Sequence, residues 1–214
     1  SAHRMRPVPT DNELVQKVDL WQAASPCWQV LRPGTMRKPA VCLSQARKFL
    51  RDMITSVREA TGSDFIIAVR ISPIIEKAGI FLDESLQLAE ILSTMDIDML
   101  HISCWDVFQG VAGDEDGPSL TNRFAEIVPK HIPLISTGAV WTSKDAQWLM
   151  EEGADLVGVA RVAIAHPDWP MHLADPDYSP QRPPFTEQHL LDVDLSPVFV
   201  EYMKRWKDFV IGGN

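Results

Sequence analysis

Four short apolar runs recur along the chain, and their spacing restricts the fold more than any other feature of the sequence. They begin at residues 65, 99, 133 and 155, so that successive starts are 34, 34 and 22 residues apart. This is about the length of a parallel strand with its crossover helix. The spacing therefore predicts four βα units and a parallel sheet, with strands at 65–71, 99–103, 133–136 and 155–159.

The first of these runs, FIIAVRI over 65–71, is short, rich in β-branched residues and bounded by Gly62 and Pro73. These properties indicate a strand buried on both faces. Apolar residues at three- and four-residue spacing predict helices in the connections, at 46–60, 83–95, 122–128 and 143–152. Thr142 followed by Asp145 is typical of an N-cap with an acidic third residue, which fixes the start of the last of these helices.

The segments outside the four units have a different character. Residues 10–24 resemble another helix, whereas 25–41 contains three prolines and a glycine and shows no clear strand. Downstream, 175–184 is a proline-rich connection. We expect 196–210 to form an amphipathic helix with Phe199, Met203 and Trp206 on one face. The sequence thus predicts a single domain over 1–214, made of a rearranged segment 1–45, βα units over 46–170 and a C-terminal extension 171–214.

Composition excludes several classes of function. The net charge of −9 and pI near 5.1 repel polyanions, so nucleic acid is not an expected partner. The cysteines, at 27, 42 and 104, are odd in number and lack C-x-x-C spacing, which argues against a disulfide framework and a zinc site. No His/Asp/Glu cluster has metal-ligand spacing, and no apolar run is long enough for a membrane span. A cytoplasmic protein without a metal is the expectation.

Two strand ends carry small residues where a phosphate group could approach the backbone. Thr137-Gly138-Ala139 ends one predicted strand, and Gly158-Val159-Ala160-Arg161 ends the next, about one βα unit later. Uncovered backbone N–H groups and a nearby arginine suit an anionic phosphate, which favours a phosphorylated cofactor. Isolated glycines at strand ends are also ordinary turn residues, and that alternative stays open.

Four consecutive βα units predict an α/β fold, namely part of a (β/α)₈ TIM barrel, whose active sites lie at the carboxyl ends of the strands. Several motifs then resemble the C-terminal half, strands five to eight, of the Old Yellow Enzyme family of FMN-dependent NAD(P)H:flavin oxidoreductases. The motifs are AVRISP at 68–73, DMLHIS at 98–103, IPLISTG at 132–138, GADLVGVAR at 153–161 and AHPDWP at 165–170.

The resemblance implies FMN as cofactor and NAD(P)H as reductant. It places Arg70 at the pyrimidine edge of the flavin, where a positive charge stabilises negative charge on the ring. It places the FMN phosphate at the ends of the last two predicted strands, around residues 137–139 and 160–161. The cofactor-binding residues expected on this basis are Arg70, Thr137, Gly138, Ala139, Gly158, Ala160 and Arg161.

The resemblance does not extend to the family's strands one to three or to its strand-four motif H-G-A-[HN]-G-Y, which supplies the substrate anchors and the tyrosine proton donor. The only tyrosines, Tyr178 and Tyr202, lie near the C-terminus, so catalytic residues stay unassigned. Two functions follow. One is an oxidoreductase that passes hydride to an activated alkene or related small electrophile. The other is a non-catalytic half-barrel that dimerises or pairs with a separate N-terminal half.

Other chemically active side chains have simpler interpretations. A lone Arg70 in a buried strand needs either a carboxylate partner or a ligand. His101, inside a strand, is expected to make a core hydrogen bond, and His166, before a proline, to be structural. Trp105, just beyond a strand, is expected to pack, with lining a pocket as the alternative. The acidic loop at 114–116 is expected to be a solvated turn, with binding of a partner as the alternative.

Overall fold

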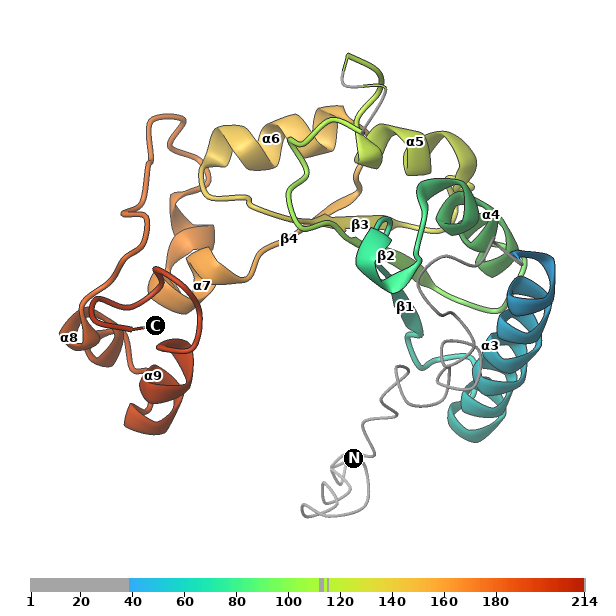
Figure 1. Ribbon diagram of the computed structural model, residues 1–214, viewed down its shortest axis with the longest axis horizontal. Coiled ribbons are helices and arrows are strands. Elements are labelled where there is room, and N and C mark those ends of the chain that lie inside the picture. The colour runs from blue at the N-terminus through green and yellow to red at the C-terminus, as the bar shows by residue number, and fades with distance from the viewer. Residues whose placement is uncertain (1–38, 112–113, 115, 214) are drawn as a thin grey trace, which may run out of the picture. The chain divides into compact units, whose positions relative to one another are not determined.

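The computed structural model describes residues 39–111, 114 and 116–213 (Figure 1). The chain falls into two units that divide between Lys48 and Phe49, and the site lies in the second. The predicted helix at 10–24 and most of the segment 25–41 lie outside the described residues. The prediction of one domain over 1–214 therefore stays a prediction.

The sheet confirms the expected parallel arrangement. Its strands are β1 (Ala68–Ile71), β2 (Met99–Ser103), β3 (Leu134–Thr137) and β4 (Leu156–Gly158). They pair in the order β1-β2-β3-β4, every pair parallel, so chain order and spatial order agree. All four carboxyl ends therefore meet at one edge of the sheet, as they do in a barrel.

Helices follow each strand, as the spacing predicts. The first described helix is α3 (Pro39–Thr61). The connections hold η1 (Glu76–Ala78), α4 (Leu82–Leu92), α5 (Leu120–Ile127), α6 (Ser143–Glu151), α7 (Arg161–Ala165) and η2 (Trp169–His172). Helices α8 (Glu187–Asp192) and α9 (Pro197–Met203) complete the C-terminal extension. Figure 1 shows α4, α5 and α6 on one face of the sheet, which we call the outer face. No helix in the described part of the chain is long and apolar enough to cross a membrane.

The two faces of the sheet differ in burial. Leu100, Ile102 and Leu134 are at most 1% exposed and belong to the hydrophobic core under the helices. Residues of the opposite parity form the inner face and are half-buried or exposed: Ala68, Arg70, Met99, His101, Ser103, Ile135, Thr137, Leu156 and Gly158. The prediction that the first strand is buried on both faces is therefore wrong. Within the described residues, helices cover only the outer face of β1, and Phe65 and Ile66, 53% and 63% exposed, precede the strand.

A capping box fixes the start of α6, as predicted. The Thr142 hydroxyl accepts a hydrogen bond from the Asp145 backbone N–H at 3.1 Å, and the Asp145 carboxylate accepts from the Thr142 N–H at 2.8 Å. Asp145 also accepts from the Trp141 N–H at 2.9 Å. These bonds satisfy N–H groups that have no partner inside the helix, so the connection from β3 into α6 has a defined course.

An ion pair holds α3 against the entry to β2. Arg58 Nη2 donates to Asp98 Oδ2 at 2.6 Å, and the same oxygen accepts from the Ile67 N–H at 2.7 Å. Arg58 Nε lies 3.2 Å from Asp96 Oδ2, within range for charge attraction but not aligned for a hydrogen bond. Asp98, the first residue of DMLHIS, therefore acts in the fold: it ties together α3, the start of β1 and the start of β2.

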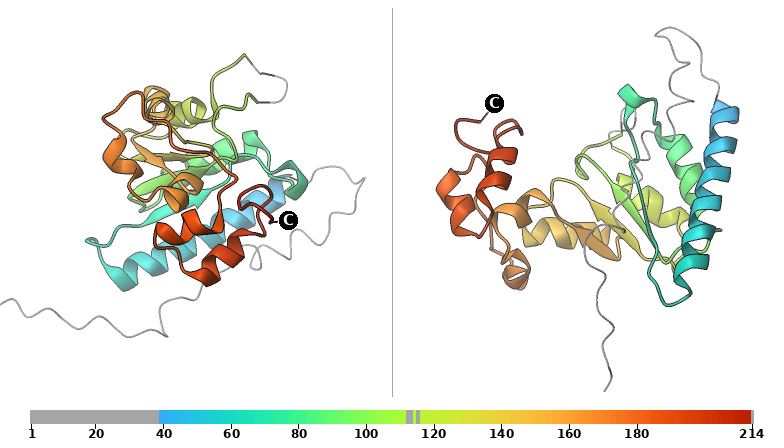
Figure 2. Two further views of the ribbon diagram at one scale, coloured as in Figure 1. Left: turned by 90° about the vertical axis from the view of Figure 1, so that its left-hand side faces the viewer. Right: turned by 90° about the horizontal axis from the view of Figure 1, so that it is seen from below.

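The C-terminal extension packs around Phe185, which is fully buried and stacks edge-on against Phe209 with ring centroids 5.3 Å apart. In Figures 1 and 2, α8 and α9 lie beside each other. Val200 and Met203 face the core of this extension. The predicted apolar face is wrong for Phe199 and Trp206, which are 39% and 49% exposed, because α9 ends at Met203 and its buried stripe runs through Val200 instead.

Candidate functional site

The inner face of the sheet gathers polar side chains near the carboxyl ends of the strands. In register, Arg70 lies beside His101, and His101 beside Ile135. One level closer to the carboxyl ends, Ser103 lies beside Thr137, and Thr137 beside Gly158. Because residues two apart share a face, these side chains form two adjacent rows. The edge nearest the carboxyl ends is therefore polar, whereas Ala68 and Met99, toward the amino ends, are apolar.

Arg70 is exposed on this face. Its Nη2 donates to Ser103 Oγ at 2.5 Å across the β1–β2 pair. Among the described residues no carboxylate lies within ion-pair distance of Arg70. Of the two alternatives open from the sequence, the structural ion pair is thus not formed within the described chain. The guanidinium has donors left for a ligand that carries carbonyl or anionic oxygens.

His101 and Thr137 are joined across the β2–β3 pair. His101 Nε2 lies 2.7 Å from Thr137 Oγ1. Partial burial, and then the positive charge of Arg70, lower the pKa of His101, so the imidazole is neutral at pH 7. The expected hydrogen bond is present, but the position differs from expectation: His101 lies half-buried on the inner face and not in the core.

Close packing explains the two glycines at the strand ends. A Cβ atom on Gly138 would lie 2.6 Å from the Cys104 carbonyl oxygen, and a Cβ on Gly158 would collide with Thr137 Oγ1. Cys104 also donates its N–H to the Thr137 carbonyl at 2.8 Å. Both glycines therefore allow neighbouring strands to approach closely at their carboxyl ends. This requirement exists with or without a ligand.

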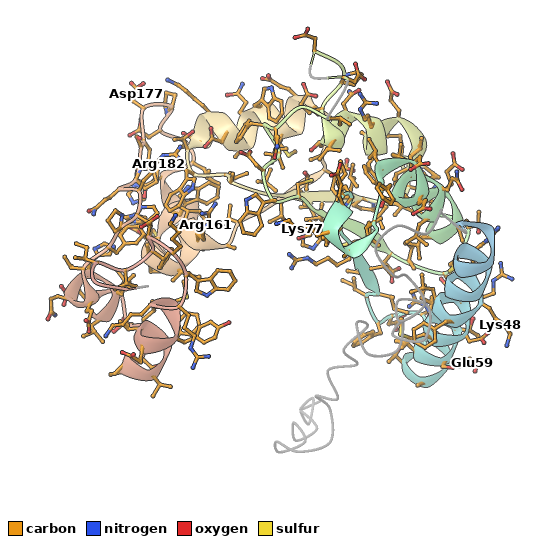
Figure 3. All side chains as sticks on the ribbon, viewed as in Figure 1. Lys48, Glu59, Lys77, Arg161, Asp177 and Arg182 are labelled. Carbon is orange, nitrogen blue, oxygen red and sulfur yellow. The ribbon has the colours of Figure 1, made fainter. Side chains whose placement is uncertain are left out.

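The turn after β3 presents backbone donors. Ala139 has a φ of 55°, in the left-handed region. Among the described residues, the N–H groups of Gly138, Ala139 and Ala160 have no hydrogen-bond acceptor. Arg161, exposed at the start of α7 (Figure 3), brings a positive charge directly after β4. Because α7 has only five residues, the cation and the free N–H groups are what suit an anion here, and the helix dipole adds little.

Three features of this edge were not predicted. The contacts of Ser103 with Arg70 and of Thr137 with His101 depend on strand register, which apolar spacing alone does not specify. Trp105, expected to pack, is 84% exposed.

Two residues outside this edge were also given roles from the sequence. His166 is structural, as expected, since its Nε2 lies 2.9 Å from the Gln181 carbonyl oxygen. Asp114, expected in a solvated turn, forms an ion pair with Arg123.

Comparison with known proteins agrees with this geometry. Residues 44–178 match the NADH:flavin oxidoreductase / NADH oxidase family. The chain belongs to this family. The match spans all four strands and the helices α4 to α7, and so includes every residue of the candidate site.

Relatives in this NADH:flavin oxidoreductase family are much longer than the part of this chain that matches them. NADH:fumarate oxidoreductase of Klebsiella pneumoniae is 28% identical over 152 residues, 69% of this chain and 16% of that protein. NADH oxidase of Thermoanaerobacter brockii is 31% identical over 159 residues, 66% of this chain and 23% of that protein. A probable NADH-dependent flavin oxidoreductase of Bacillus subtilis, YqiG, is 32% identical over 108 residues, 49% of this chain and 29% of that protein.

A solved structure supports the fold. The old yellow enzyme homologue from Zymomonas mobilis superposes with a TM-score of 0.51 at 24% identity, over 65% of this chain and 39% of that one. The prediction of a partial (β/α)₈ barrel of Old Yellow Enzyme type, with a C-terminal helical extension, is thus confirmed. The chain spans about two fifths of the length of this structural relative.

Proposed function

We propose that this chain binds FMN at the carboxyl ends of β1 to β4 and serves as an oxidoreductase that takes hydride from NAD(P)H. The observation that carries the proposal is the position of Arg70: an exposed guanidinium without a carboxylate partner in the described chain, on the same edge as the turn at Gly138. Family membership supports FMN as the ligand, since the family is defined by NADH and flavin.

The residues of this edge divide between two ends of the proposed ligand. The free N–H groups of Gly138, Ala139 and Ala160, together with Arg161, suit the phosphate. Gly158 and Thr137 allow β3 and β4 to approach closely at their carboxyl ends. Arg70, which donates a hydrogen bond to Ser103, suits the carbonyl edge of the flavin ring. FMN, when bound, supplies hydride transfer between a nicotinamide and an acceptor.

The proposed acceptor is an activated alkene or a related small electrophile. The name of the Klebsiella relative supports this, because fumarate is an activated alkene, and the names of the relatives favour NADH as the first reductant to test. Tyr178 stacks on His172 with ring centroids 4.4 Å apart, and Tyr202 lies on α9. In this proposal the proton comes from solvent. We also propose a cytoplasmic location, which the cysteine pattern of the sequence favours.

A flavin titration tests the proposal. The purified chain is titrated with FMN and with riboflavin, which lacks the phosphate, and binding is followed by visible absorption and flavin fluorescence. We expect one FMN per chain. Arg161→Ala should weaken FMN about tenfold or more and leave riboflavin unchanged, because charge-assisted hydrogen bonds to the phosphate are lost. Arg70→Ala should weaken both. Arg51→Ala, an exposed arginine on α3, is the control. Absence of FMN binding at high concentration would contradict the proposal.

A second function, a half-barrel that pairs with a second copy or with a separate N-terminal half, is favoured by one observation. Edge strand β4 places Leu156, 45% exposed, on the inner face, and Phe65 and Ile66 are exposed just before edge strand β1. Unpaired edges and exposed apolar side chains favour association. Light scattering tests this: a dimer that dissociates in Leu156→Lys but not in Met150→Lys, a residue 48% exposed on α6, would support it. A stable monomer would contradict pairing with a second copy.

A further inference from the structure

Trp105 is an indole exposed to solvent beside the candidate site. It is 84% exposed, whereas Trp141 and Trp169 are 3% and 4% exposed and Trp206, on the extension, is 49% exposed. A tryptophan side chain can bury 150–250 Å², about the largest apolar surface of any residue, so its exposure forgoes a large stabilisation of the fold. Packing within the described chain therefore does not account for this residue.

The backbone on both sides of Trp105 is held. On one side Cys104 is 7% exposed, donates its N–H to the Thr137 carbonyl at 2.8 Å, and packs closely against Gly138. On the other side Asp106 Oδ1 accepts from the Phe108 N–H at 3.0 Å, and Val107 is 1% exposed. The indole therefore starts from a fixed point, two residues after the end of β2 and next to the turn that follows β3.

The position of Trp105 along the chain places its backbone at the polar edge. Ser103 lies on the inner face, and Cys104 turns into the core on the outer side. Trp105 follows Ser103 by two residues, and the Ser103 hydroxyl accepts a hydrogen bond from Arg70 Nη2, so the indole begins at the same carboxyl edge as this pair. A broad, electron-rich aromatic side chain, exposed to solvent, therefore begins at the same edge of the sheet as a cation with free donors and the free N–H groups of the turn.

We propose that Trp105 stacks on the planar, electron-poor ring of a ligand bound at the carboxyl ends of β1 to β3. Two rings have this chemistry: the isoalloxazine of a flavin and the nicotinamide of a dinucleotide. The inference rests on the proposed function, because it takes its ligand from the same edge. It concerns only the ring, and the phosphate contacts of Arg161 are independent of it.

Riboflavin, FMN and NAD⁺ as probes test the inference. Their affinities are measured by equilibrium dialysis and by flavin fluorescence, with NAD⁺ added both to the chain alone and to the chain saturated with flavin. Trp105→Ala should keep its far-UV circular dichroism and unfolding midpoint, since the side chain is exposed. If the ring is the flavin, Trp105→Ala weakens riboflavin and FMN about tenfold and equally, and flavin fluorescence is quenched less on binding.

The variants distinguish a flavin ring from a nicotinamide ring, and they test the Trp105 inference separately from the proposed phosphate site. If the ring is the nicotinamide, Trp105→Ala leaves both flavins unchanged and weakens NAD⁺ about tenfold. Trp105→Phe should retain most of the affinity in either case, and Trp206→Ala should change nothing. Equal affinities of wild type and Trp105→Ala for all three probes, or a wild type that binds none of them, overturn the inference. An effect of Trp105→Ala on riboflavin with no effect of Arg161→Ala on FMN would instead contradict only the phosphate site.

Discussion

The Thr137 hydroxyl on β3 occupies the space that a Cβ atom on Gly158 of β4 would need. The same hydroxyl lies 2.7 Å from His101 Nε2 on β2. The Thr137 side chain therefore contacts both neighbouring strands, β2 through His101 and β4 at Gly158, and the glycine makes room for it. The site edge is shaped by this packing before any ligand is considered.

Gly158→Ala should destabilise the chain, because the new methyl group and Thr137 Oγ1 cannot both fit. We expect a loss of about 1–3 kcal/mol in the free energy of unfolding, the usual cost of overpacking. Thr137→Ala removes the hydroxyl, so the double variant should lose less than the sum of the two single variants. Urea unfolding of the four proteins checks this. Additive losses would show that the two residues do not compete for space.

Asp98→Asn should remove a pH dependence of stability. The hydrogen bond from the Ile67 N–H, and then Arg58, hold the pKa of the Asp98 carboxyl below its usual value. A carboxyl with a lowered pKa stabilises the folded state above its unfolded pKa of about 3.9, and this stabilisation is lost as the pH falls through the folded pKa. The urea midpoint of the wild type should therefore fall more steeply below about pH 4 than that of Asp98→Asn.

Glu59→Gln is the control for this measurement, since Glu59 is an exposed carboxylate on α3 (Figure 3). Its unfolding midpoint should follow the wild type over the whole pH range. Parallel curves for the wild type and Asp98→Asn would mean that the Arg58–Asp98 pair does not contribute to acid sensitivity.

The strands and helices were predictable because their signals are local. Apolar runs at βα spacing indicated all four strands, and the pair Thr142 and Asp145 specified the start of α6. Burial was less predictable: the run at 65–71 has the composition of a strand covered on both sides, but what covers a strand depends on distant segments. The same holds for Phe199, whose exposure follows from how α9 meets the core around Phe185.

The candidate site was predictable in part. Arg70 and the glycine turns were accessible through motifs, because those positions combine an unusual residue type with a strand end. The bonds that position them were not, since Ser103 reaches Arg70 only in the observed register. For Trp105 the sequence favoured packing over lining a pocket, because an aromatic residue after a strand usually packs, and only its exposure in the structure argues against packing.

Trp169→Phe should lower the free energy of unfolding, because it removes one buried hydrogen-bond donor, the indole N–H. Trp169 is 4% exposed, and its Nε1 donates to the Trp141 carbonyl at 2.7 Å in a buried position, which gives a structural role to the tryptophan of AHPDWP. Phenylalanine keeps most of the apolar contact but leaves that carbonyl without its partner, at a cost of about 1–3 kcal/mol. Trp206→Phe, at a residue 49% exposed, should stay within about 0.5 kcal/mol of the wild type. Equal unfolding midpoints for the two variants would contradict this role.

Cys104 should be almost unreactive in the folded chain. Burial, and then the nearby charge of Asp106, raise the pKa of its thiol to about 12. At pH 8 the thiolate, which is the reactive form, then makes up about one part in 10⁴, and the side chain is only 7% exposed. In a Cys27→Ser, Cys42→Ser background, alkylation by iodoacetamide at pH 8 should be slow without denaturant and fast in urea above the unfolding midpoint, as followed by mass spectrometry. Fast alkylation under native conditions would show that the Cys104–Gly138 contact opens readily, and with it the turn that carries the proposed phosphate contacts.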